Sequence, residues 1–377
     1  MKERNERICD LRFTIDATIE YRAAFPRRRM KTRRRVLWVA PLVVLLAGLA
    51  WLLLPPPDPL FHGIPESDWI KNIVYNGSEE QTKQWRDFGP EGVRVLTRAL
   101  DRADRRSRWE RAYVRAYQRI APRLPGFLAG RLPAVTSDST YSTRMCLVDL
   151  LSRLGNEAKS ATPAMIHALN DRMGGVRMIA ISFFTWGEDE NARLNLMPEK
   201  EKKKLLPEFV RLARDLESGV RNNAAIALRY YPEQHEVVVP VLTNALHDTY
   251  QPARLLAAVA LNRVAPDRVV EAGVVPVAIE ILRNPDGQIA YQAAQLLGEM
   301  KAEPALAVPA LIEALENTNT LVAATAAQAL VKFKESADTI ISALEKAAQR
   351  KNSVSGYAKG ALKQLESKAP ENQGVKK

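Results

Sequence analysis

The stretch from Glu303 to Leu330 contains two amphipathic helical patterns joined by a short polar turn. In the first pattern apolar residues recur at intervals of three and four positions, at Val308, Leu311, Ile312 and Leu315. In the second pattern they recur every four positions, at Val322, Ala326 and Leu330. This spacing places the apolar side chains on one face of each helix. One pair of helices cannot bury such faces alone, so the stretch predicts an all-α chain of stacked helical pairs.

Four further copies of this pattern precede it in the same register. Each copy contains a proline, at Pro163, Pro207, Pro240, Pro276 and Pro309. Eight positions later each copy has Asp or Asn, at Asp171, Asp215, Asp248, Asn284 and Asn317. Nine positions after that each copy has alanine, at Ala180, Ala224, Ala257, Ala293 and Ala326. Three columns that keep one spacing through the copies predict a regular α-solenoid.

Each column has a structural explanation. Proline is tolerated in the first turn of a helix, where no intrahelical N–H bond is lost, so we expect the prolines near helix starts. Asp and Asn side chains accept hydrogen bonds from nearby backbone N–H groups, so we expect them to begin the turn between helices. Alanine allows two helix axes to approach closely, so we expect the alanines to be buried where helices cross.

These columns resemble HEAT repeats, in particular the short HEAT-like form of the PBS-lyase type. The Val-Arg pair that such repeats often place early in a helix stands here as Val176-Arg177 and Val220-Arg221. The resemblance covers roughly residues 140–365, with weaker copies toward the N-terminus. It implies a right-handed α-solenoid. It also implies a binding surface more than an activity, because these repeats mostly serve in interactions.

A second resemblance lies before the repeats. The segment Gly63-Ile-Pro65 with Trp69 after it resembles a Gly-x-Pro-x-x-x-Trp segment of bacterial membrane-anchored HEAT-repeat proteins. Trp69 and Ile70 are apolar and precede the first helical pair. Because a solenoid needs its open apolar end covered, we expect these two residues to cap the first repeat.

The N-terminal segment is strongly basic. The whole chain has a net charge of +12, and residues 1–35 contain 12 Lys and Arg against 5 Asp and Glu. The remaining residues are therefore only weakly basic, which argues against nucleic acid as a partner. Met30 lies within this segment, so the sequence is compatible with a translation start at Met1 or at Met30.

The 19 residues from Val36 to Leu54 contain no charged side chain and follow the basic segment directly. A helix of this length spans about 28 Å, close to the hydrocarbon core of a bilayer, so we predict a single transmembrane anchor at 36–54. The basic flank predicts a cytoplasmic N-terminus and an exported repeat domain. A cleaved signal peptide is the alternative, but the apolar run continues past the small residues where cleavage would occur, which favours an uncleaved anchor.

The sequence predicts five segments in order. They are a basic cytoplasmic segment at 1–35, a transmembrane anchor at 36–54, a spacer and N-terminal cap at 55–78, the HEAT-like α-solenoid at 79–366 and a disordered tail at 367–377. Within the solenoid we expect one helical pair over 79–101 with its turn at Gly89-Pro90, and a separate helix over 106–120. An insertion around 187–203 lengthens one copy and predicts a projection from one edge of the solenoid.

Signals for catalysis or metal binding are scarce. None of the four histidines has the short spacing to another that metal sites use: His62, His167, His235 and His247. The two cysteines, Cys9 and Cys146, fall on opposite sides of the predicted anchor and cannot pair within the chain. We therefore predict no cofactor, no metal site and no enzymatic activity.

Two sets of side chains are candidate partner-binding residues. The first is the outward column four positions after each proline, which we expect to line the concave groove: His167, Arg211, Asn244, Glu280 and Glu313. The second is an arginine stripe near the membrane-proximal end: Arg108, Arg111, Arg115 and Arg119. Intervals of three and four positions place these arginines on one helical face, where we expect contact with anionic lipid headgroups or an acidic partner.

These features together predict a membrane-anchored, non-catalytic scaffold whose solenoid surface binds a protein or peptide partner. One alternative is an enzyme of the bilin-lyase type, because such lyases contain similar repeats. That alternative requires a bilin pocket, for which the sequence provides no residues. Another alternative is a binder of anionic lipid or polymer that acts through the arginine stripe.

Overall fold

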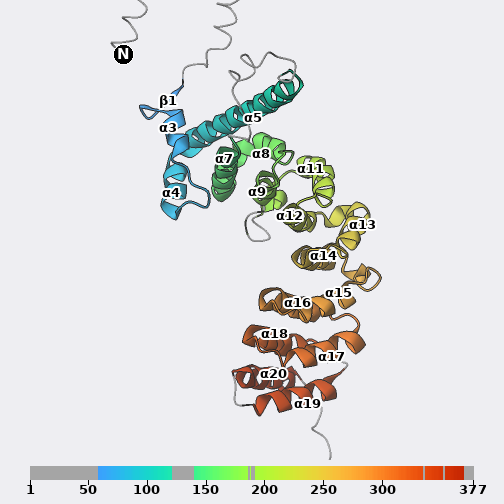
Figure 1. The fold of residues 1–377 in the computed structure, drawn as a ribbon. Helices are drawn as coiled ribbons and strands as arrows, with labels where there is room; N and C mark the ends of the chain where they lie inside the picture. Colours follow the sequence, from blue (N-terminus) through green and yellow to red (C-terminus); the bar gives the residue numbers. More distant parts are fainter. Residues whose placement is uncertain are drawn as a thin grey trace, which may run out of the picture. The chain divides into compact units, whose positions relative to one another are not determined.

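The computed structural model describes residues 58–120, 140–185, 187, 192–333, 336–350 and 353–368. The described residues from Leu60 onward belong to one compact unit, which contains the repeats (Figure 1). The predicted basic segment, the predicted anchor at 36–54 and most of the predicted tail lie outside the described residues. Among the described residues, no helix is both long enough and apolar enough to cross a membrane.

A small aromatic cap begins the repeat unit. It consists of strands β1 (Leu60–Phe61) and β2 (Ile64–Pro65), which pair antiparallel, and helix α3 (Glu66–Lys71). The Phe61 side chain is buried, and its backbone carbonyl accepts a hydrogen bond of 2.9 Å from the Trp69 indole. Both rings pack edge to face against Phe88. Trp69 and Ile70 are packed against the core and cover the open end of the first helical pair, in agreement with the expectation.

Helices α4 (Glu79–Asp87) and α5 (Gly89–Ile120) form the first pair. The turn falls at Gly89, as predicted, where φ is +56°, a conformation that glycine adopts without strain. The prediction of a separate helix over 106–120 is wrong, because α5 contains no glycine or proline beyond its first turn and continues through this point. The apolar residues of this part do not form a buried face, since Trp109 is 62% exposed and Ile120 50% exposed, while Glu110 is buried.

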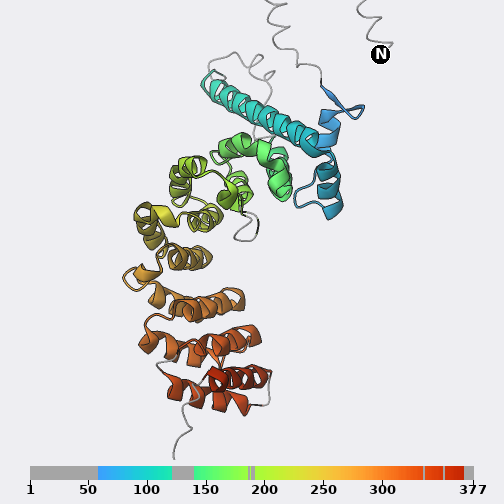
Figure 2. The ribbon, with the colours of Figure 1, turned by 180° about the vertical axis from the view of Figure 1, so that it is seen from behind.

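Beyond α5 the helices alternate between two layers (Figures 1 and 2). The inner layer, on the inner side of the bend in the ribbon, contains α7 (Tyr141–Arg153), α9 (Gly174–Thr185), α12 (Ser218–Leu228), α14 (Gln251–Val264), α16 (Gly287–Met300), α18 (Thr320–Leu330) and α20 (Val354–Lys368). The outer layer contains α8 (Thr162–Ala168), α11 (Glu199–Leu212), α13 (His235–Ala245), α15 (Val274–Leu282), α17 (Pro304–Ala314) and α19 (Ala337–Ala348). The 3-10 turns η3 (Gly155–Ala161), η5 (Pro232–Gln234) and η6 (Pro266–Arg268) and the short helix α10 (Arg193–Leu196) connect them.

Small side chains determine the spacing within the inner layer. The alanines of the repeat column, from Ala180 to Ala326, are all completely buried, as expected. Most successive inner helices pack extensively on one another, above all α16 on α18, whereas successive outer helices contact each other less; α14 and α16 are the exception, since they contact each other about as little as α15 and α17 do. Closer packing on one side bends a stack toward that side. This explains why the helices with the alanine column lie on the inner side of the bend.

The proline column only partly agrees with the expectation. Pro163 and Pro276 lie in the first turn of α8 and α15, as predicted. Pro207, Pro240 and Pro309 lie inside α11, α13 and α17, which begin several residues earlier. The residue before each of these three is a buried aliphatic: Leu206, Val239 and Val308. Burial of these side chains extends the helices toward the N-terminus in spite of the backbone hydrogen bond that proline removes.

The Asp and Asn column begins every turn, as expected. In all five copies the side-chain Oδ1 atom accepts a hydrogen bond of 2.7–3.0 Å from the backbone N–H two residues later. The three aspartates also form ion pairs with arginines of the inner helices: Arg144 with Asp171, Arg177 with Asp215, and Arg221 with Asp248. We call this series the arginine ladder. It joins each inner helix to the following turn.

The arginine ladder ends where the column changes to asparagine. Asn284 provides no negative charge, and Arg254 instead pairs with Glu280 at 2.6 Å. In the next copy both partners have changed, since Ala290 occupies the arginine position and Asn317 the carboxylate position. The turn-forming hydrogen bond therefore persists through all copies, while the ionic link is restricted to the N-terminal half of the array.

Replacement of Asp248 by asparagine separates the two roles of this side chain. Asp248→Asn keeps the acceptor for the Tyr250 N–H but leaves the largely buried Arg221 without its carboxylate. We expect a loss of about 1–3 kcal/mol in the free energy of unfolding at pH 7, measured by denaturant titration. Equal stability of the variant and the wild-type chain at pH 7 would contradict a stabilising ladder.

The same variant has a defined pH dependence. The hydrogen bond from Arg221 holds the pKa of Asp248 below its ordinary value. The stabilisation by the ion pair is therefore present in full above the ordinary carboxyl pKa of about 4. It is lost as the pH falls through the lowered pKa of Asp248. We expect the stability difference between the two proteins to shrink on acidification. A difference that stays constant into the acid range would show that the ion pair is not its source.

A substitution at Gly298 can test the close approach of the inner helices α16 and α18. A methyl group at this position would lie 2.8 Å from the Ala329 Cβ and 2.9 Å from its Cα. Because the backbone of α18 cannot yield without moving away from α16, we expect Gly298→Ala to lower the free energy of unfolding by about 1–3 kcal/mol. Thermal unfolding followed by circular dichroism measures the change.

The matched control for this substitution lies in the last inner helix. At Gly360 in α20 an added methyl group meets no atom within 4 Å. Gly360→Ala should therefore raise the stability by up to about 1 kcal/mol through the better helix propensity of alanine. If both variants were stabilised, the close contact between α16 and α18 would be refuted.

Candidate functional site

The solvent-facing side of the inner layer carries many neutral polar side chains on α12, α16 and α18, while charged side chains such as Arg263, Glu299 and Lys363 are exposed elsewhere on the inner helices. On helices α12, α16 and α18 the half-buried and exposed side chains are mainly amides and hydroxyls: Asn222, Asn223, Gln288, Gln292, Gln295, Thr325 and Gln328. Aliphatic side chains interrupt them, among them Ile226, Ile289 and Leu321. We call this set the inner surface. Amides and hydroxyls both donate and accept hydrogen bonds, so the inner surface presents neutral donors and acceptors along the array.

Hydrogen bonds within the chain hold part of this row in place. The Asn223 amide donates to the Met178 carbonyl and to the Ser182 hydroxyl, both at 3.1 Å, and so links α12 to α9. The Gln295 amide donates to Glu299 at 2.8 Å on the same helix. Side chains that are already oriented lose less conformational entropy when they bind a partner.

The column expected to line the concave groove lies on the other layer. Its members are all exposed, but they belong to α8, α11, α13, α15 and α17 of the outer layer (Figure 1): His167, Arg211, Asn244, Glu280 and Glu313. The expectation placed the proline-bearing helices on the concave side, and this is wrong. The inner side is formed by the helices with the alanine column, because their small side chains allow the closer approach.

Both carboxylates of this outer column are engaged in ion pairs within the chain. Glu280 binds Arg254 at 2.6 Å, and Glu313 binds Arg283 at 2.8 Å. The hydrogen bond from Arg254 holds the pKa of Glu280 below its ordinary value. The acidic end that the sequence indicates for this column is therefore neutralised by neighbouring arginines.

The arginine stripe lies on the C-terminal half of α5. Arg108, Arg115 and Arg119 are exposed, and Arg111 is half-buried. Arg108 forms an ion pair of 3.1 Å with Asp104. Arg111 donates a hydrogen bond of 2.7 Å to Ser107. Beside the stripe, the exposed Trp109 stacks on Tyr113 with ring centroids 5.6 Å apart. The structure thus brings aromatic rings, as well as cations, to this part of the surface.

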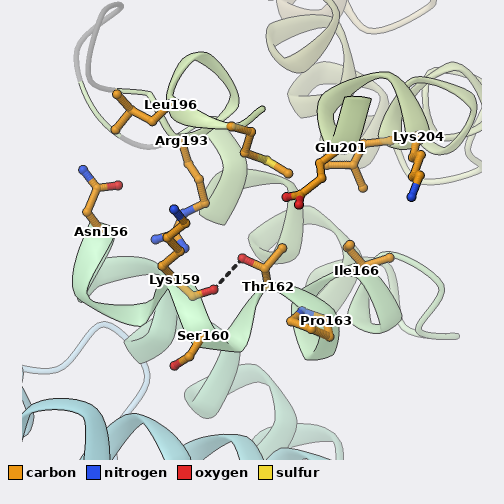
Figure 3. A pocket seen from close by; sticks show the side chains of 12 residues that line it. Asn156, Lys159, Ser160, Thr162, Pro163, Ile166, Arg193, Leu196, Glu201 and Lys204 are labelled. Atoms are coloured by element: carbon orange, nitrogen blue, oxygen red, sulfur yellow. Dashed lines mark hydrogen bonds between the residues drawn. The ribbon is translucent and has the colours of Figure 1, made fainter. Parts of the chain in front are cut away.

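The insertion forms one wall of a cleft of about 750 Å³ (Figure 3). The opposite wall consists of η3 and α8, while α10 and the first turns of α11 belong to the inserted residues. The main polar side chains of the lining are Asn156, Lys159, Ser160, Thr162, Arg193, Glu201 and Lys204. The apolar side chains are Pro163, Ile166, Leu196, Met197 and Leu205. Its volume falls within the range of small-molecule sites.

Arg193 is the buried charge of this cleft. Only 4% of it is exposed, and its guanidinium lies 3.6 Å from the centroid of the Phe183 ring. Nη2 donates to the Gly155 carbonyl, whereas Nε and Nη1 have no hydrogen-bond partner. Burial lowers the pKa of Arg193 to about 10, so the group is still charged at neutral pH. The length of the insertion was the only sequence signal for this site, because burial of the arginine depends on distant residues.

The described residues provide little for metal binding or nucleophilic chemistry. Within the ranges that the structure describes, no three His, Cys, Asp or Glu side chains form a cluster suited to a metal ion. Cys146 is buried, and burial raises the pKa of its thiol. A raised pKa disfavours the reactive thiolate, so Cys146 has the properties of a core residue. Cys9 lies outside the described residues.

Comparison with known proteins is consistent with the repeat architecture. Residues 275–362 match the family model of HEAT repeats. The crystal structure of an engineered protein from the Northeast Structural Genomics Consortium aligns with a TM-score of 0.50 and 21% identity, over 80% of this chain and 84% of that chain. A designed armadillo repeat protein in complex with the peptide (KR)4 aligns with a TM-score of 0.43 and 19% identity, over 54% of this chain and 99% of that chain.

A search among curated proteins found no match. The engineered protein shares the fold, but an identity of 21% shows nothing about the activity of the present chain. The family match covers the C-terminal copies, and the same columns continue through the N-terminal copies in register. The chain is therefore a HEAT-like repeat protein.

Proposed function

We propose that this chain is a non-catalytic scaffold that binds a polypeptide segment on the inner surface of its solenoid. The proposal rests on the uncharged row of amide and hydroxyl side chains there, among them Gln288, Gln295 and Gln328. An extended polypeptide needs partners for its backbone N–H and C=O groups when it leaves water. A row of side-chain amides supplies both donors and acceptors without requiring a particular pattern of charge in the partner.

The outer layer supports this choice of surface by contrast. Its carboxylates Glu280 and Glu313 already pair with Arg254 and Arg283. A charged partner that bound to this column would have to compete with ion pairs that are already formed within the chain. The inner surface imposes no such competition, because its side chains are neutral.

We further propose that the scaffold is held at a membrane by a single span at 36–54. The support is the uncharged run of 19 residues that follows a basic segment. In this proposal the N-terminus lies in the cytoplasm and the repeats lie on the exported side, periplasmic or extracellular. The partner would then be a polypeptide of that compartment.

Two alternatives stay predictions. Contact of the arginine stripe with anionic lipid headgroups gains support from the exposed Trp109 beside it, since tryptophan is enriched at membrane interfaces. The bilin-lyase alternative rests on the resemblance of the repeats alone.

Charge placed on the inner surface should disrupt partner binding. Gln295 and Gln328 are exposed on the adjacent helices α16 and α18. In the double variant Gln295→Arg/Gln328→Arg, two added charges would have to be desolvated at the interface, so we expect partner recovery to fall about tenfold or more. The measurement is affinity purification of the full-length chain from its own cells, with quantitative mass spectrometry of the co-purified proteins.

The matched control adds the same two charges to the outer layer. His167→Arg/Asn244→Arg changes exposed residues of α8 and α13 and should leave recovery unchanged. Loss of the partner in this control, with normal recovery in the inner variant, would place the partner on the outer column. Equal recovery from all three proteins would refute binding through either face of the solenoid.

The proposed topology has a direct test. Protease added to intact spheroplasts should digest the repeat domain and remove a C-terminal epitope tag, because the repeats would lie outside the cytoplasmic membrane. A cytoplasmic protein serves as the control for membrane integrity. Survival of the tag until the spheroplasts are lysed would overturn the orientation.

A further inference from the structure

The cleft at the insertion contains a cation that no carboxylate among the described residues neutralises. Arg193 is 4% exposed, and no carboxylate of the described chain forms an ion pair with it. The equally buried Arg144, by contrast, binds Asp171 at 2.7 Å. An unpaired charge out of water is costly for a folded chain. A site that retains such a charge is suited to an anion that comes from outside.

The guanidinium of Arg193 has an unused pair of donors. One N–H of Nη2 binds the Gly155 carbonyl, and Nε and Nη1 have no partner. Nη2 has two N–H groups, one on the side of Nε and one on the side of Nη1. When one of them binds Gly155, the other points in the same direction as an N–H of the free nitrogen on its side. These two N–H groups form a pair of parallel donors. This is the geometry that binds a carboxylate through two hydrogen bonds. Because Nε and Nη1 are buried in the unliganded chain, the inference requires that lining side chains move when the anion binds.

The other lining residues indicate the kind of anion. Lys159 and Lys204 add two positive charges and Glu201 one negative charge, so with Arg193 the cleft has an excess of positive charge. A large part of the wall is aliphatic: Ile166, Leu196, Met197 and Leu205. An inorganic anion such as phosphate would leave this apolar wall without a contact. An apolar body attached to a carboxylate would cover it.

We infer that the cleft between η3–α8 and α10–α11 binds a carboxylate that carries an apolar group, with Arg193 as its bidentate ligand and Lys204 as a second cation. Two sources share this chemistry, the C-terminus of a peptide that ends in an apolar residue and a small free organic acid. The cleft lies beside α8 of the outer layer and not on the inner surface. The inference therefore does not rest on the proposed scaffold function.

The experiment is isothermal titration of the full-length chain in a non-ionic detergent with three probes. The probes are benzoate, a short acetylated peptide that ends in leucine with a free carboxylate, and the same peptide as its C-terminal amide. We expect at least one of the two acids to bind and the amide not to bind. Binding of the peptide acid alone identifies a peptide terminus as the source, and binding of benzoate alone identifies a small acid.

Variants locate the binding to the cleft. Arg193→Gln should lower the affinity for the acid about tenfold or more, since it removes a charge-assisted bidentate contact. Lys204→Gln should lower it by about threefold, as expected for an exposed charge. The matched control is Lys203→Gln, because Lys203 is its exposed neighbour on α11 but does not line the cleft. This control should bind with unchanged affinity.

Three results would overturn the inference: no binding of either acid at millimolar concentration, equal binding of the peptide acid and its amide, or unchanged affinity in both Arg193→Gln and Lys204→Gln. The thermal midpoint of Arg193→Gln without ligand should be equal to or above that of the wild-type chain, because an unpaired buried charge is removed. If this variant fails to fold, the comparison of Lys204→Gln with Lys203→Gln decides, since both positions are exposed.

Discussion

The close packing of small side chains between successive inner helices is the contact on which the rest of the structure depends. Ala293 and Ala326 are completely buried, and the Gly298 backbone lies against Ala329. Their size permits a short distance between helices on one side of the stack, while successive helices of the outer layer contact each other less. The bend, and the identity of the concave face, follow from this difference. The arginine ladder also depends on it, because Arg177 reaches Asp215 only when the two repeats lie close.

The parts of the fold that could be predicted from the sequence are those that depend on local spacing. Periodicity predicted the helical pairs and their register, and the Asp and Asn column predicted turns that all form. The helix starts were harder, because burial of a residue such as Leu206 extends a helix beyond a proline. The layer that forms the concave face could not be derived from spacing within one repeat. It depends on the distance between neighbouring repeats, and so the candidate column was assigned to the wrong side.

The two proposed binding sites differ in how far the sequence could indicate them. The neutral inner surface is visible in the repeats as glutamine, asparagine and threonine at exposed positions, once the inner helices are known. The cleft depends on contacts that no sequence pattern predicts. Arg193 lies over the Phe183 ring and donates a hydrogen bond to the Gly155 carbonyl. The first site arises from repetition and extends along several copies. The second arises where one copy departs from the others, which allows a single small site on an otherwise regular surface.

The end of the arginine ladder at Asn284 has a consequence for the cooperativity of the array. In a linear stack each repeat contacts only its neighbours, so the coupling between neighbours determines whether the stack unfolds as one block or in parts. Protonation weakens coupling in the half that contains Asp171, Asp215 and Asp248, but it leaves the apolar coupling of the C-terminal repeats intact. The ion pairs of the C-terminal repeats, such as Arg283 with Glu313, are exposed and contribute less, so we expect acid to weaken the coupling more in the N-terminal half and to unfold that half first.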